Sequence, residues 1–109
     1  MKQWLYIILL CTTTVFAETN TVATVGPQTG QQVYEQHCAL CHTTGVAGAP
    51  KFRDMQDWKQ RVAGKKLAEL TQTALQGKNA MPPKGTCMQC DEALLQQAIE
   101  YMLPPGWEK

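Results

Sequence analysis

The stretch "EQHCALCHTTGVAGAP", residues 35–50, holds two cysteines three positions apart, a histidine directly after the second, and glycine-rich chain beyond it. Such a stretch is either half of a metal site or a covalent anchor for haem. In a helix, Cys38 and Cys41 lie on one face of one turn, where both thiols can reach the two vinyl groups of a haem. His42 is then directed under the ring, towards the iron. The order C-x-x-C-H is typical of c-type haem attachment.

A second C-x-x-C pair, Cys87 and Cys90, raises two rival interpretations. Four thiols can bind zinc, but the two pairs of a zinc ribbon are usually separated by roughly 15–20 residues. Here Cys87 lies 46 positions after Cys41. A thioredoxin-like thiol pair needs a βαβ setting, which the sequence lacks. The spacing therefore favours haem, with zinc and thiol redox chemistry as the alternatives.

The first 17 residues are typical of a secretory signal peptide. Lys2 gives a positive start, "WLYIILL" an apolar core, and Val15 and Ala17 a small-residue cleavage pattern. The apolar segment is shorter than the roughly 20 residues of a membrane span, so cleavage after Ala17 is favoured over an uncleaved anchor. Export predicts a location in the periplasm, which is oxidising. Cys11 would leave with the signal.

The length and charge of the chain limit the number of domains and the kinds of partner that it can have. The 109 residues allow one small domain, and ten Lys and Arg against nine Asp and Glu argue against a protein that binds nucleic acid. A domain of this size has a thin core and usually needs a disulfide, a metal or a cofactor.

The pattern of apolar residues predicts an all-α fold of three to four helices, since no segment alternates as a strand would. We expect a flexible arm over residues 18–29, a cofactor-binding domain over 30–103 and a C-terminal tail over 104–109. The helices are expected at about residues 30–42, 54 or 57 to 64, 66–76 and 91–103.

Capping residues and glycines set the expected helix ends. We expect Thr29 to cap the first helix and Asp91 to be the N-cap of the last. Gly77 is placed to end the third helix in a left-handed turn. Residues 43–52 and 77–90 are long loops for so small a domain, and long ordered loops of this kind usually surround a bound group.

The second axial position on the iron is expected to be a methionine. His37 directly precedes Cys38 and cannot reach the opposite face of the haem without breaking the helix. Met81 lies in "NAMPPKG", a loop that two prolines stiffen. Met55, Met88 and Met102 are the alternatives, and Met102 suits core packing better. His/Met ligation is usual in electron carriers.

A carrier with both axial positions filled exchanges electrons but does not easily activate oxygen or peroxide. The expected function is therefore one-electron transfer and not an enzymatic reaction. The alternatives are a haem peroxidase or gas sensor with an open iron site, and a zinc module.

The chain resembles the class I cytochromes c, and among them the bacterial cytochrome c5 family. The resemblance covers about residues 28–102 and rests on "VYEQHCALCH", "GAPK", "NAMPPKGTCMQC" and "DEALLQQAIEYM". It implies the class I cytochrome c fold around one covalently bound haem c. It also implies a periplasmic carrier with redox protein partners, a reductase and a terminal oxidase or reductase, and transient contact with a membrane complex.

The resemblance assigns roles to individual residues. Cys38 and Cys41 would form the haem thioethers, while His42 and Met81 would bind the iron as axial ligands. The Pro50 carbonyl would orient the histidine, and Asn79 would steer the methionine. The family also has a disulfide that matches Cys87 and Cys90, and two nearby thiols in an oxidising compartment should pair and brace the Met81 loop.

The resemblance and the composition predict roles for three further sets of residues. Gly30 and Tyr34 match close-contact positions where the first helix crosses the last, near Ile99 and Tyr101. Trp58 and Arg61 are expected near the haem propionates. Small apolar residues are expected to form a docking rim for partners, namely Ala47, Gly48, Ala49 and Pro82.

Overall fold

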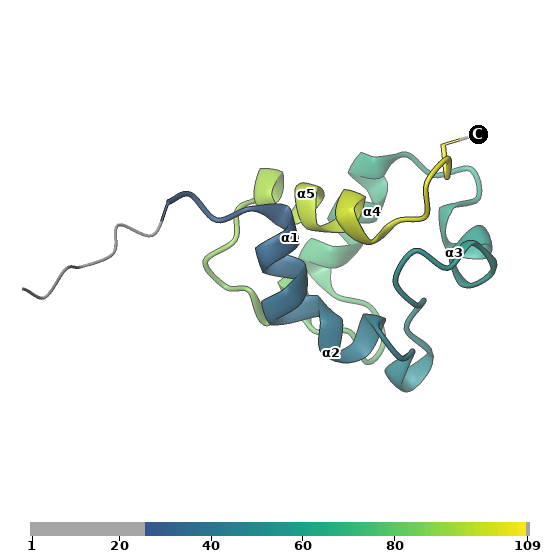
Figure 1. Cartoon of the computed structure of the whole chain (residues 1–109), viewed down its shortest axis with the longest axis horizontal. Coiled ribbons are helices and arrows are strands. Elements are labelled where there is room, and N and C mark those ends of the chain that lie inside the picture. The colour runs from purple at the N-terminus through teal and green to yellow at the C-terminus, as the bar shows by residue number, and fades with distance from the viewer. Residues whose placement is uncertain (1–25, 109) are drawn as a thin grey trace, which may run out of the picture.

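A computed structural model describes residues 26–108, which form helices joined by long loops (Figure 1). Within this range there is no strand, and the one ladder contact is an isolated bridge between Lys78 and Met81. The all-α prediction is confirmed. The predicted signal peptide and residues 18–25 of the predicted arm lie outside the described residues.

The first helical stretch runs through residues 30–42 in three joined pieces: α1 at Gly30–Val33, a π-helical turn at Tyr34–Cys38 and α2 at Ala39–His42. Thr29 caps it, as predicted. Its Oγ1 accepts from the Gln32 amide at 3.3 Å, and the Gln32 Oε1 accepts from the Thr29 amide at 2.9 Å. The π turn was not predicted. It widens the helix over the turn that ends at Cys38, the first thiol of the attachment motif, and such turns often mark functional sites.

The remaining helices are α3 at Met55–Val62, α4 at Leu67–Gln76 and α5 at Glu92–Met102. Asp54 is the N-cap of α3, which settles the choice between Asp54 and Asp57. Asp91 is the N-cap of α5, as predicted, and its Oδ1 accepts from the Leu94 amide at 2.8 Å. Carboxylates at these positions satisfy amides that the first helical turn leaves unpaired.

The end of α4 differs from the prediction. Gly77 has φ 78° and ψ 162°, which is not the left-handed helical conformation but an extended one that only glycine adopts readily. The reason is the close return of the chain. A Cβ atom on Gly77 would lie 2.8 Å from the Met81 carbonyl oxygen and 2.9 Å from the Pro83 nitrogen. This glycine therefore joins the end of α4 to the Met81 loop.

Two helix contacts build the core, α1 against α5 and α4 against α5 (Figure 1). Gly30 is the point of closest approach, as predicted, but its neighbour is the Gln97 backbone, which a Cβ atom on Gly30 would overlap. The Tyr34 and Tyr101 rings pack edge to face with centroids 5.5 Å apart. Apolar burial at these crossings holds the helices together.

The C-terminal tail packs against the domain. Pro104 is buried, and Trp107 lies against the core cluster that contains Tyr34 and Trp58. Among residues 26–108, no helix has the length and the apolar run needed to cross a bilayer.

Candidate haem-binding site

The two thiols of the attachment motif are free of disulfides and differ in burial. Cys38 is buried, and Cys41 is half-buried. Burial, and to a smaller extent the charge of a Cys41 thiolate, raise the pKa of the Cys38 thiol to about 11. At neutral pH Cys38 is therefore an uncharged thiol inside the core, where an apolar porphyrin edge can contact it.

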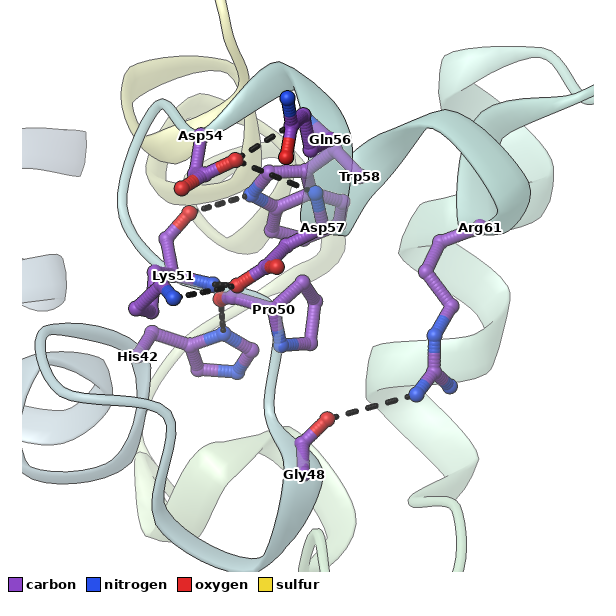
Figure 2. Close-up of polar contacts among 9 residues, drawn as sticks. All are labelled: His42, Gly48, Pro50, Lys51, Asp54, Gln56, Asp57, Trp58 and Arg61. Atoms are coloured by element: carbon purple, nitrogen blue, oxygen red, sulfur yellow. Dashed lines mark hydrogen bonds and ion pairs between the residues drawn. The ribbon is translucent and has the colours of Figure 1, made fainter.

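His42 is buried beside these thiols, and one hydrogen bond fixes its ring. Its Nδ1 lies 2.8 Å from the Pro50 carbonyl oxygen (Figure 2). A carbonyl only accepts, so Nδ1 carries the proton and Nε2 keeps the free lone pair. A metal-binding histidine has this arrangement. The Trp58 ring is stacked on the imidazole, with an interplanar angle of 12° and centroids 5.9 Å apart.

The segment that carries Pro50 is held by the first turns of α3 (Figure 2). Trp58 Nε1 donates to the Lys51 carbonyl at 2.9 Å. Asp57 Oδ2 accepts from the Lys51 amide at 3.1 Å and pairs with Lys51 Nζ at 3.4 Å. The Lys51 amide is the main cause of the lowered pKa of Asp57, and its ammonium contributes less. Sequence reasoning missed this role of Asp57, for which the only signal was its place near the start of α3.

Arg61 and Trp58, which were expected near the haem propionates, both donate to backbone carbonyls. Arg61 Nη2 lies 3.4 Å from the Gly48 carbonyl oxygen, and the Trp58 partner is Lys51. A propionate role for these two residues stays a prediction.

The methionines that the structure describes differ in environment. Met81 is half-buried and packs against the core cluster that includes Cys38 and Trp58. Met55 and Met88 are 44% and 71% exposed, whereas Met102 is 3% exposed within the core. Met81 thus combines a loop position with contact to the cluster around the attachment helix.

Asn79 lies two residues before Met81 and is exposed. Its φ is 51°, a conformation that asparagine tolerates better than most residues. Its backbone shapes the turn that carries Met81. The steering of the methionine by its side chain stays a prediction.

Cys87 and Cys90 are joined by a disulfide in this structure. Both are almost fully buried, at 0% and 1% exposure, and they pack with Val33, Leu95 and Ala98. Two of the four thiols are therefore not available for the alternative zinc site. Residues 26–108 also contain no group of three or more His, Cys, Asp or Glu placed to hold a metal ion.

The donor set fits a c-type haem. It consists of two free thiols one helical turn apart, an imidazole with Nε2 free and a thioether on the same core cluster. The first two features are what covalent attachment and proximal ligation require.

Comparisons with known proteins agree with this donor set. A family model described as cytochrome C oxidase, cbb3-type, subunit III matches residues 26–102. Cytochrome c5 of Ectopseudomonas mendocina is 41% identical over 78 residues, which cover 71% of this chain and 90% of that protein. The chain belongs to the class I c-type cytochromes, close to cytochrome c5. Cytochrome c5 of Azotobacter vinelandii is 44% identical over 78 residues, covering 71% and 94%.

Solved structures show the same relationship. A mono-haem ferrocytochrome c from Shewanella putrefaciens has a TM-score of 0.63 and 39% identity, covering 70% of this cytochrome and 93% of that chain. A cytochrome c in an electron-transfer complex with nitrite reductase has a TM-score of 0.62 and 44% identity, covering 67% and 88%. This cytochrome therefore binds one haem c covalently, and it is an electron carrier and not an enzyme.

Proposed function

We propose that this cytochrome is an exported, periplasmic one-electron carrier whose haem iron is bound by His42 and Met81. Cys38 and Cys41 would form the thioethers to the haem. The observation that carries the proposal is the hydrogen bond from His42 Nδ1 to the Pro50 carbonyl, which leaves Nε2 free in the residue directly after the thiol pair. Contact of Met81 with the cluster that holds Cys38 supports the sixth ligand.

Each ligand has a physical task. When bound, the haem iron supplies a reversible one-electron couple. Pro50 holds His42 in one tautomer and one orientation, which raises the basicity of Nε2. The neutral Met81 thioether favours reduced iron and raises the potential relative to two nitrogen ligands. With both axial positions filled, external oxygen or peroxide has no ready site on the iron.

The proposed partners are a reductase as donor and a terminal oxidase or reductase as acceptor. The related cytochrome c that was solved with nitrite reductase supports an acceptor of the reductase class. Ala47, Gly48 and Pro82 of the proposed docking rim are exposed, and Ala49 is half-buried. A small apolar contact suits transient docking. Ala47→Glu should slow the turnover of a partner enzyme. Unchanged turnover would contradict the proposal that these residues form the docking surface.

The proposed location depends on residues 1–17 acting as a cleaved signal peptide. Fractionation of expressing bacteria should recover the cytochrome in the periplasm, with a mature N-terminus at Glu18. Recovery of the uncleaved chain in the membrane fraction would contradict cleavage.

Replacement of Met81 tests the axial assignment. Met81→Ala should abolish the weak far-red sulfur–iron band of the oxidised protein and lower the midpoint potential, because the thioether ligand is lost. Met88→Ala is the matched control, since Met88 is exposed and lies in the same loop region. If Met81→Ala kept the band and Met88→Ala lost it, Met88 would be the ligand.

A further inference from the structure

The segment between Met81 and the disulfide has an unusual backbone. Lys84, Gly85 and Thr86 have φ values of 58°, 54° and 70°, three positive values in succession. Residues with a Cβ atom rarely adopt this conformation, and a β-branched residue such as threonine does so least of all. Such a segment persists only where surrounding contacts hold it.

The hydrogen bonds of Lys84 are placed to hold residues 84–86 in this conformation. Lys84 Nζ donates to the Cys90 carbonyl at 3.0 Å, and the Lys84 carbonyl accepts from the Cys87 amide at 3.0 Å. Together with the disulfide between Cys87 and Cys90, these bonds close residues 84–90 into one ring of contacts. Lys84 is half-buried, so its ammonium bond is shielded more from water than that of an exposed lysine.

The same segment is connected to Met81 and to the attachment helix. Pro82 directly follows Met81, and its carbonyl accepts a hydrogen bond from the Gly85 amide at 3.1 Å. Met81 and Lys78 exchange two backbone hydrogen bonds of 2.9 and 3.0 Å. On its other side Gly85 is buried against the attachment helix, where a Cβ atom would lie 3.9 Å from Cys38 Sγ. A change in residues 84–86 would therefore reach the Met81 loop directly.

We propose that Lys84 is a positioning residue for the sixth ligand. By bonding the Cys90 carbonyl, its ammonium keeps residues 84–86 in their left-handed conformation and so limits the movement of Met81 away from the iron. The proposal rests on the proposed function, in which Met81 is that ligand. Lys84 itself does not touch the metal.

Imidazole added to the oxidised holoprotein measures how firmly Met81 is held. It binds the iron only when Met81 has moved away, so its apparent affinity rises with the population of the open loop. Lys84→Met removes the ammonium and keeps the length of the side chain. We expect imidazole to bind this variant about tenfold more tightly, as the loss of one charged hydrogen bond predicts.

Two variants control for other effects. Lys78→Met removes an exposed ammonium from the same loop and leaves the backbone bonds to Met81 intact, so it should bind imidazole like the wild type. Lys84→Arg keeps a donor and should bind imidazole more weakly than Lys84→Met. If Lys84→Met does not take up haem, Lys84→Gln replaces it against the same controls.

The outcomes separate this inference from the proposed function. Equal imidazole affinities in Lys84→Met, Lys78→Met and the wild type would overturn the role of Lys84 while leaving Met81 as ligand. Retention of the sulfur–iron band in Met81→Ala would overturn the ligand assignment itself. A tenfold tighter affinity confined to Lys84→Met, with the band lost in Met81→Ala, would support both.

Discussion

At the scale of single residues, one hydrogen bond decides what His42 is able to do. The Pro50 carbonyl oxygen accepts a hydrogen bond from Nδ1–H, with the two heavy atoms 2.8 Å apart, and so leaves the lone pair of Nε2 free (Figure 2). Without this acceptor, either nitrogen could carry the proton and the ring could rotate. The tautomer is thus fixed by the backbone of a loop eight residues further along the chain.

Among the residues of the Met81 loop, we expect the replacement of Gly77 to lower the free energy of unfolding most. Gly77→Ala would need a Gly-only backbone conformation and would place a Cβ atom against the Met81 carbonyl. We expect a loss of about 3 kcal/mol or more in the free energy of unfolding, measured by chemical denaturation. Gly64→Ala is the control, because Gly64 also has a positive φ but nothing lies within 4 Å of its Cβ position. That control should cost about 1 kcal/mol. Equal losses would contradict the close contact at Gly77.

Asp57 should make the stability of the protein depend on pH in acid. Its folded pKa is lowered, mainly by the Lys51 amide, so folding favours the carboxylate. This contribution is present above the unfolded pKa of about 3.9 and is lost as the pH falls through the folded pKa. Denaturation of wild type and Asp57→Asn at several pH values should show a difference that shrinks below about pH 4.

The control for Asp57 is Glu100→Gln, which removes an exposed carboxylate from α5. It should leave the acid dependence of the wild type in place. A difference between wild type and Asp57→Asn that stayed constant from neutral to acid pH would show that the carboxylate is not what stabilises Lys51.

Sequence reasoning anticipated the contacts that follow from local motifs. The attachment motif and the caps at Thr29 and Asp91 rest on short patterns, whereas the contact of Pro50 with His42 was implied by the resemblance to the cytochrome c5 family. The bonds from Asp57 to Lys51 and from Lys84 to Cys90 were not anticipated. Any exposed carboxylate or lysine is compatible with their sequence positions, and only the folded loops bring them to those backbone groups.

At the scale of elements, the helices follow their caps and apolar spacing, but the π turn at Tyr34–Cys38 does not. One wide turn changes the hydrogen-bond register without changing which residues are apolar, so the pattern of the sequence is the same with or without it. Buried Val33, Tyr34 and Cys38 are compatible with both. Gly77 shows the same limit, since a glycine predicts a positive φ but not the value of ψ.

The crossing of α1 and α5 depends on the absence of a side chain at Gly30. Gly30→Ala should destabilise the protein by about 1–3 kcal/mol, because the new methyl group would overlap the Gln97 backbone and push the helices apart. Thermal unfolding of the oxidised holoprotein would measure this. Gly26→Ala is a suitable control, since nothing lies within 4 Å of its Cβ position. A Gly30→Ala protein as stable as the control would show that the helices do not cross so closely.

At the scale of the whole molecule, the core is divided between two clusters of buried residues. One contains Cys38, Trp58 and the end of α5, and the other surrounds the disulfide. A small domain has little apolar surface to bury, so a bound haem should supply much of the first cluster. The disulfide stabilises the second mainly by restricting the unfolded chain.

Removal of the two attachment thiols should therefore lower the stability of the protein more than removal of the disulfide does. We expect Cys38→Ser/Cys41→Ser to lose covalent haem and to unfold without a sharp thermal transition in circular dichroism. Cys87→Ser/Cys90→Ser should retain haem and lose only about 2 kcal/mol. If the first variant unfolded as cooperatively as the wild type, haem would not be part of the core.

The optical spectrum of the exported wild-type holoprotein, oxidised and reduced, tests directly whether a covalently bound haem carries His42 and Met81 as axial ligands. Ligation by His42 and Met81 predicts a sharp reduced c-type band, together with the weak far-red sulfur–iron band in the oxidised form. A c-type spectrum with high-spin features and no sulfur band would contradict the axial assignment and favour an open iron site.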